Sequence, residues 1–197
     1  MSYKPDKQLL KHSMEQFSFL AQQLINVAVM VDVESSGLSP VNDDIVEIAI
    51  LDCSDCTVIY DSLIYTTTKI SAKASSINKI TNDMLVGKPT LGEAYNEFAD
   101  SFDGKFIIAS NSDFDEKMLN YGLLKLDIAP PANIWVCLQK LYRNYSLQPV
   151  PVITSLNTEH ICKQLGITAG KHSAASDAYA QVQILHAMAN MQMPRFI

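Results

Sequence analysis

The sequence predicts a single mixed α/β domain, in which helices pack on a sheet that begins with an antiparallel meander. Three strand-like segments come first, joined by links short enough for an antiparallel meander. Helical and strand-like segments then alternate, which is typical of a layered structure. With 197 residues, 48% hydrophobic and 18% charged, the chain can build one sizeable core. No linker interrupts this pattern, so we expect one core domain.

The first half of the chain is expected to hold a helix and then the meander. Apolar residues recur at helical spacing over residues 5–25, ahead of the first strand. We therefore divide the chain into an N-terminal helical extension, residues 1–25, and a core domain, residues 26–197. The extension is expected to pack on the domain's own surface, with docking to a partner protein as the alternative. The three strands are predicted at residues 27–31, which form an unbroken apolar run, and at residues 45–51 and 57–65.

The second half is expected to consist mainly of helices around one further strand. Thr90 and Glu93 form a capping box after Pro89, so a helix begins there. The remaining elements are a strand over 106–109, a helix over 113–124, a short helical piece over 135–142, a helix over 155–165 that ends at Gly166, and a last helix over 173–191.

The composition argues against a membrane protein. No apolar run is long enough to cross a bilayer, and the N-terminus lacks the basic-then-apolar order of a signal peptide. We expect a cytoplasmic protein with no membrane partner. Cys53 and Cys56 form the motif C-S-D-C without the second pair that a zinc ribbon needs, so we interpret Ser54-Asp55 as a hairpin turn.

Charge is distributed unevenly along the chain, whose net charge is -6. Residues 12–68 contain nine acids and no Lys or Arg, whereas residues 69–88 contain four lysines and one acid. The lysine-rich stretch either forms one wall of a phosphate groove or is a solvated face. The sequence leaves both interpretations open.

Two carboxylates end the first predicted strand. Side chains at positions i and i+2 share one face of a strand, so Asp32 and Glu34 point the same way. Two carboxylates beside a buried strand are costly unless a cation pairs with them, and hard oxygen ligands suit Mg²⁺ and Mn²⁺. The alternative is a strand that simply reaches solvent.

Further candidates lie near the starts of two later helices. Asp113 is the expected cap of the helix after the fourth strand, and Asp115 lies inside its first turn, where an acid is favourable without any function. His172 and Asp177 lie five residues apart, so they would not share a helical face. If Ser173 caps the last helix, His172 lies in the loop before it. That arrangement suits a fixed metal ligand next to a movable base.

Four ordered motifs resemble those of the DEDDh (DnaQ-like) 3′-5′ exonucleases, a family that is similar to the proofreading subunits of bacterial replicative polymerases. The motifs are D-V-E-S-S-G-L, I-N-K-I-T-N-D-M-L, S-N-S-D-F-D and H-S-A-A-S-D-A, and the resemblance covers residues 26–190. It implies an RNase H-like fold, a mixed five-stranded sheet with flanking helices, and makes residues 26–197 an exonuclease domain. Ser110 departs from the pattern, because many members have histidine there.

Carried over residue by residue, the resemblance implies a complete catalytic set. The implied metal-binding acids are Asp32, Glu34, Asp115 and Asp177, and the implied general base is His172. The implied substrate contacts are Ser35, Gly37, Leu38, Asn111 and Phe114. The implied cofactors are two Mg²⁺ or Mn²⁺ ions, whose positive charges would balance the four carboxylates.

The expected function is removal of 5′-mononucleotides from the 3′ ends of single-stranded DNA or RNA. Two alternatives use the same fold. One is a catalytically silent subunit that docks a polymerase or nuclease partner through residues 5–25. The other is a phosphodiesterase that acts on very short oligoribonucleotides. A third, an endonuclease with an RNase H-like fold, fits the motif order least well.

Overall fold

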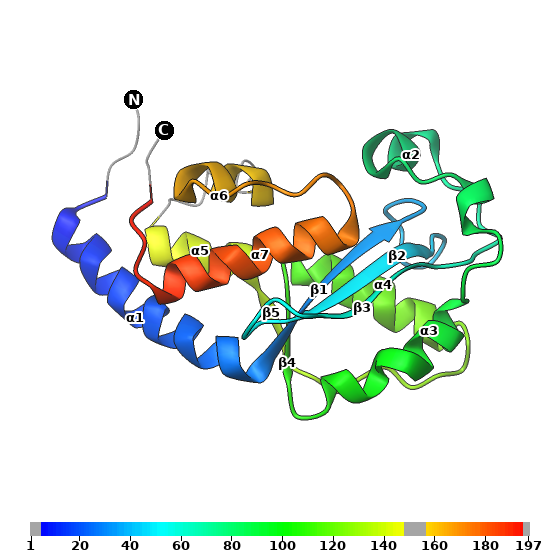
Figure 1. The fold of residues 1–197 in the computed structure, drawn as a ribbon, viewed down its shortest axis with the longest axis horizontal. Helices are drawn as coiled ribbons and strands as arrows, with labels where there is room; N and C mark the ends of the chain where they lie inside the picture. The colour runs from blue at the N-terminus through cyan, green and yellow to red at the C-terminus, as the bar shows by residue number, and fades with distance from the viewer. Residues whose placement is uncertain (1–4, 148–156, 195–197) are drawn as a thin grey trace.

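The computed structural model describes residues 5–147 and 157–194, which fold around one five-stranded sheet (Figure 1). The strands are β1 (Ala28–Ser35), β2 (Ile45–Asp52), β3 (Val58–Leu63), β4 (Phe106–Ala109) and β5 (Trp135–Cys137). They lie side by side in the order β3-β2-β1-β4-β5. The first three pair antiparallel, and β4 and β5 pair parallel to β1 and to each other. The predicted RNase H-like mixed sheet is confirmed.

Helices cover both faces of this sheet. The α-helices are α1 (Lys7–Val27), α2 (Ala72–Asn78), α3 (Leu91–Phe98), α4 (Ser112–Leu124), α5 (Leu138–Ser146), α6 (Thr158–Leu165) and α7 (Ala174–Ala189), and the 3₁₀ helices are η1 (Asn82–Leu85) and η2 (Ala99–Phe102). In the described parts of the chain, each helix is either too short or too polar for a transmembrane segment.

Alternate residues of β1 face two separate hydrophobic cores. Met30 joins a core built with α1, α5, α6 and α7, whereas Val29 and Val31 join a second core built with α3 and α4. Because side chains alternate along a strand, Asp32 and Glu34 continue the Met30 side. The two acids therefore face α7.

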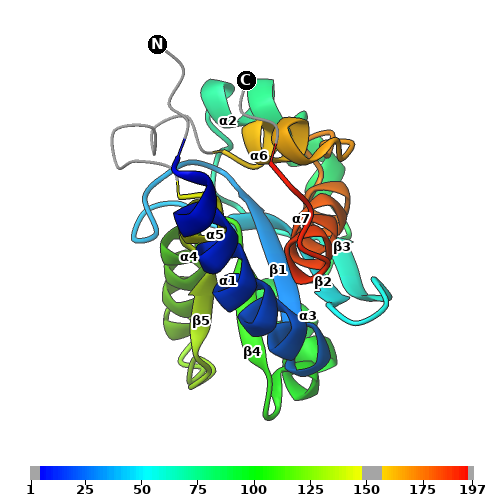
Figure 2. The same cartoon turned by 90° about the vertical axis from the view of Figure 1, so that its left-hand side faces the viewer.

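α1 lies against α7 and α5 and runs into β1 without a loop (Figures 1 and 2). Its inward face buries apolar residues at helical spacing, namely Leu10, Met14, Ala21 and Leu24. The Asp6 side chain accepts hydrogen bonds from the first turn and caps the helix. The helix thus packs on the domain's own surface, as expected. The division of the chain at residue 25 stays a prediction.

The predicted helical piece over residues 135–142 is wrong in its first part. Trp135–Cys137 form strand β5, and helix α5 begins only at Leu138. The reason is tertiary, because Val136 pairs with Ile108 of β4 at the edge of the sheet. Of the helix predicted over 155–165, residues 155 and 156 lie outside the described residues, and the rest forms α6, which ends at Gly166 in the left-handed conformation.

Two expectations about helix caps also change. Asn111, rather than Asp113, occupies the cap position of α4, and the Asp113 carboxylate instead pairs with Lys140 at 3.2 Å. Ser173 does occupy the cap position of α7, but its side chain makes no capping hydrogen bond. The capping box of Thr90 and Glu93 is confirmed, as is the hairpin turn between Cys53 and Cys56.

Candidate active site

Three of the predicted acids lie together at the end of β1. One carboxylate oxygen from each of Asp32, Glu34 and Asp177 lies within 4.8 Å of the others. The first two come from β1, and the third comes from the first turn of α7, which packs on that face of the sheet. The strand and the helix thus deliver hard oxygen atoms to one small volume.

Asp115 reaches the same place from the opposite face of the sheet. β4 pairs with β1 only as far as Met30, so the β4 side of β1 has no strand partner beyond that residue. The first turn of α4 fills this position, and Asp115 Oδ1 accepts a hydrogen bond from the Val33 N–H at 3.3 Å. The side chain is buried, at 6% exposure. Asp115 therefore contacts the backbone between the two acids of β1.

Burial raises the pKa values of these four carboxyls, and repulsion by neighbouring acids raises those of Asp32 and Glu34 further. Desolvation is the largest cause for each of them, and it raises the pKa of Glu34 and that of Asp115 to about 7. The pKa of Asp32 is raised well above its usual range by burial and then by the charges of Asp115, Asp177 and Glu34. Burial also raises the pKa of Asp177, although the charge of His172 lowers it.

His172 lies in the loop that leads into α7, as predicted, and it is exposed there. Its backbone is left-handed, with φ of 57°, a conformation that histidine adopts more readily than most residues. Gly170, two residues earlier, passes so close to Asp177 that a Cβ atom at Gly170 would collide with the Asp177 side chain and backbone. The loop therefore fits closely around the α7 acid and holds His172 beside it.

A glutamate outside the predicted set fixes the start of α7. Glu47 pairs with Glu34 across β1 and β2, so both side chains face α7. Glu47 Oε2 accepts a hydrogen bond from the Ala174 N–H at 2.9 Å, which satisfies one of the free N–H groups of the helix start. Strand pairing brings the two glutamates opposite each other, and sequence spacing alone gave no signal for this.

A cavity of about 330 Å³ opens at the acids. It is lined by Asp32, His172, Asp177 and Gln181, together with Ala169, Gly170, the α6 cap residue Asn157 and the first two residues of α6, Thr158 and Glu159. Gln181 was missed by the sequence analysis, although its place four residues after Asp177 puts both on one face of α7. Its Nε2 donates to Asp32 Oδ1 at 2.6 Å.

A second cavity, of about 530 Å³, is lined by Glu34. It contains four of the five predicted substrate contacts, Ser35, Gly37, Leu38 and Phe114. Asn111 does not line it and is exposed. The helix α2, which the sequence analysis did not anticipate, supplies the opposite wall with Ala74, Ile77 and Asn78. Lys73 also lines the cavity, so one lysine of the basic stretch shares a cavity with Glu34.

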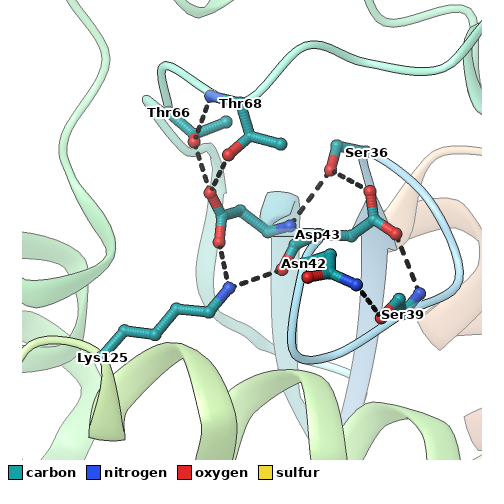
Figure 3. A network of polar contacts seen from close by, with 8 residues as sticks. Ser36, Ser39, Asn42, Asp43, Thr66, Thr68 and Lys125 are labelled. Carbon is teal, nitrogen blue, oxygen red and sulfur yellow. Dashed lines mark hydrogen bonds and ion pairs between the residues drawn. The ribbon is translucent and has the colours of Figure 1, made fainter.

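The loop that carries Leu38 is held by a network of polar contacts (Figure 3). The Asp43 carboxylate accepts hydrogen bonds from the Ser39 N–H at 2.9 Å and the Ser36 hydroxyl at 3.1 Å. A side chain at Gly37 would fall 2.5 Å from that carboxylate, so the tight loop requires glycine. Leu38 itself is 75% exposed at the rim of the cavity.

Lys125, at the end of α4, ties this loop to the rest of the domain. Its Nζ donates to the Asp43 carbonyl at 2.9 Å and to Asp44 Oδ1 at 2.7 Å. The other carboxylate oxygen of Asp44 accepts from the hydroxyls of Thr66 and Thr68. These contacts lower the pKa of Asp44 against the effect of its burial. Figure 3 shows the lysine reaching across to the loop from the helix below it.

The donor set fits divalent cations. Hard carboxylate oxygens from Asp32, Glu34 and Asp177 converge, and Asp115 adds a fourth carboxylate next to them. No ion pair formed within residues 5–147 and 157–194 involves any of these four acids. Carboxylates so close together repel one another unless cations neutralise them. The residues present therefore match Mg²⁺ or Mn²⁺ in charge and in ligand type.

Comparison with known proteins agrees with this arrangement. The family model RNase_T, described as exonuclease, matches residues 29–185. The PolC-type DNA polymerase III of Thermotoga petrophila is 30% identical over 157 residues, which are 76% of this chain and 11% of that protein. The DNA polymerase III subunit epsilon of Treponema pallidum is 35% identical over 91 residues, which are 45% of this chain and 42% of that protein. The chain thus spans a small part of the PolC-type relatives.

Solved structures share the fold. The nuclease domain of 3′hExo, a DEDDh family member bound to rAMP, superposes with a TM-score of 0.70 at 16% identity and covers 87% of this chain and 96% of its own. Exonuclease X, solved with 5′ overhanging duplex DNA, gives 0.62 at 23% identity and covers 85% and 97%. The family model matches residues 29–185, which are most of this chain, and the fold brings the acids together. The chain therefore belongs to the DEDDh (DnaQ-like) exonuclease family.

Proposed function

We propose that this exonuclease removes 5′-mononucleotides from the 3′ ends of single-stranded DNA or RNA with the help of two divalent cations. The observation that carries the proposal is the convergence of Asp32, Glu34 and Asp177, with Asp115 beside them, between two cavities. Bound cations would neutralise the acids, activate water and stabilise the attacking and leaving oxygens of the phosphodiester. Without such neutralisation the site would repel an anionic substrate.

The chain's own groups divide the remaining work. The four acids would hold the cations. Glu47 and Gly170 fix the start of α7 and the loop before it, which carry Asp177 and His172. His172 is exposed at the rim of the acidic cavity and takes a proton from the attacking water, because neutral imidazole is a base near pH 7.

The terminal base is received by the larger cavity. Leu38 and Phe114 offer apolar surfaces there, and such surfaces stack with any base and so tolerate sequence. Lys73 supplies a positive charge at the same cavity for a backbone phosphate. The Ser35 hydroxyl donates to the Gly37 carbonyl at 2.6 Å, so it supports the loop from within.

A second candidate function is a silent subunit that docks a polymerase through α1. One observation favours it, because the outward face of α1 exposes Leu9, Phe19 and Leu20 while the inward face is buried. Relatives named PolC-type polymerase and polymerase III subunit epsilon make a polymerase the partner of choice. Docking through α1 would not by itself prevent catalysis, because the acids are carried by β1, α4 and α7 rather than by α1. The silent subunit differs in that it would cleave no substrate.

The deciding experiment is cleavage of a 5′-labelled single-stranded DNA and of the matching RNA, each with Mn²⁺, Mg²⁺ or EDTA. We expect a ladder that shortens from the 3′ end and disappears in EDTA. An internally cut product, or cleavage that persists in EDTA, would contradict the proposal. Two-nucleotide RNA substrates are tested in the same assay. If only these are cleaved, the protein is a phosphodiesterase of short oligoribonucleotides. If no substrate is cleaved although Mn²⁺ binds, the silent subunit is favoured.

A further inference from the structure

One buried polar atom beside the acids has no hydrogen-bond partner. Gln181 on α7 is 1% exposed, and it lines the acidic cavity. Its Nε2 donates to Asp32 Oδ1 at 2.6 Å, whereas its Oε1 is buried without a partner among the described residues. Buried polar atoms are nearly always paired, so an unpaired one beside a binding site points to something that completes it.

The surroundings of Gln181 indicate which kind of group would bind its Oε1 atom. The cavity brings its side chain together with Asp32 of β1 and Asp177 of α7. Asp177 lies one helical turn before Gln181, so both side chains leave α7 on the same face. The acids attract a cation rather than an anion. The amide oxygen is a neutral hard ligand that can bind Mg²⁺ directly or accept a hydrogen bond from a water bound to the cation.

We propose that Gln181 is a positioning residue of the cation site, with its two amide atoms used for two purposes. Nε2 orients the Asp32 carboxylate, and Oε1 offers a further oxygen to the hydrated cation. The inference rests on the proposed metal dependence and deepens it, since it adds to the four acids a neutral residue that sets cation affinity. Groups that support metal ligands in this way typically change affinity by roughly 10- to 100-fold when they are removed.

The first test measures Mn²⁺ affinity by isothermal titration, with MnCl₂ alone as the probe and the full chain as the protein. We expect Gln181→Met to weaken Mn²⁺ binding by roughly 10- to 100-fold, because methionine keeps the shape but lacks both amide atoms. The matched control is Gln183→Met. Gln183 lies two residues further along α7 and donates to Cys56 Sγ at 3.4 Å, away from the acids, so its variant should bind Mn²⁺ as the wild type does.

The fold of each variant is checked by thermal melting in EDTA before titration. If Gln181→Met does not fold, Gln181→Ala replaces it, because alanine also removes both amide atoms. Unchanged Mn²⁺ affinity in a folded Gln181 variant would overturn the inference. If the wild type bound no Mn²⁺, the proposed function itself would fail, and the two failures are therefore distinguishable.

A second test separates the two purposes of the amide. A crystal structure of the wild-type protein soaked in MnCl₂, with Mn²⁺ located by its anomalous signal, shows what faces Oε1. We expect the cation or a water bound to it. A water that contacts only protein atoms there would overturn the role of Oε1 and leave Gln181 as a support of Asp32 alone.

Discussion

At the scale of single residues, His172 is the group whose role depends most on its surroundings. It is exposed, it precedes α7, and a left-handed backbone and a tight glycine loop hold it beside Asp177. We expect His172→Ala to keep Mn²⁺ binding but to slow single-turnover cleavage by roughly 10²- to 10⁴-fold, the usual contribution of a general base.

The matched control for this variant is His12→Ala, because His12 is an exposed histidine on α1, far along the chain from the acids. Cleavage and Mn²⁺ titration are measured on both. A His172→Ala protein that cleaves at the wild-type rate would remove His172 from the mechanism. A large loss of Mn²⁺ affinity would instead assign it to the cation site.

The sequence predicted the site at this scale where spacing along one element decides the geometry. Asp32 and Glu34 share a face because they are two apart on a strand, and that placement is confirmed by the cluster they form with Asp177. Glu47 was missed because it faces Glu34 only through strand pairing. Gln181 was missed because a glutamine on a helix carries no signal of its own until a buried, unpaired atom is seen.

At the scale of elements, the contacts of Lys125 join the end of α4 to the loop that carries Leu38. We call these contacts the tether and expect it to act independently of the acids. The ion pair of Lys125 with Asp44 is partly exposed, and such pairs contribute roughly 0 to 1 kcal/mol. We therefore expect Lys125→Met to loosen the loop and raise KM by roughly 2- to 5-fold, the equivalent of about 0.5–1 kcal/mol. The value of kcat should stay unchanged, because the four acids do not contact the tether.

Two further variants make this prediction specific. Lys125→Arg keeps the charge and the donors, so it should restore KM. Lys117→Met removes an exposed lysine of the same helix that forms no ion pair within the described ranges, so it should leave both constants unchanged. A fall in kcat for Lys125→Met with unchanged KM would show that the tether acts on the chemistry rather than on substrate binding.

Short elements account for most of what the sequence could not predict at this scale. β5 has three residues and is a strand only because β4 lies beside it, so its local pattern was taken for helix. α2 has seven residues, too few for a helical period to be visible, yet it forms one wall of the larger cavity. Long elements with a clear period, such as α1 and α7, were placed to within a few residues of their ends.

At the scale of the whole molecule, the fold brings together acids that destabilise it when no cation is bound. The mixed sheet and its helices followed from the order of elements and from the family resemblance, and both are confirmed. The order of elements could not predict how strongly the acids destabilise the folded protein, because that depends on how deeply they are buried. This destabilisation is reflected in the raised pKa values of Glu34 and Asp115, each about 7 in the folded protein.

A carboxyl with a raised pKa in the folded state makes stability depend on pH in a definite direction. The usual values are 4.5 for Glu34 and 3.8 for Asp115. Between those values and 7, the folded protein binds more protons than the unfolded chain, so rising pH favours unfolding. The stability that these two protonated groups contribute is fully present below pH 4 and is lost as the pH rises through 7.

We therefore expect the melting temperature of the protein in EDTA to fall between pH 5 and pH 8 more steeply than that of a Glu34→Gln, Asp115→Asn double variant. The amides do not titrate, so the difference between the two proteins reports the titration of Glu34 and Asp115 together with their effect on the neighbouring Asp32. Saturating Mn²⁺ should raise the wild-type melting temperature most at pH 8, because the cation binds the charged carboxylates. Equal pH slopes for the two proteins would mean that Glu34 and Asp115 titrate normally in the fold. The acids would then be solvated, and cation binding would not be needed to offset their burial.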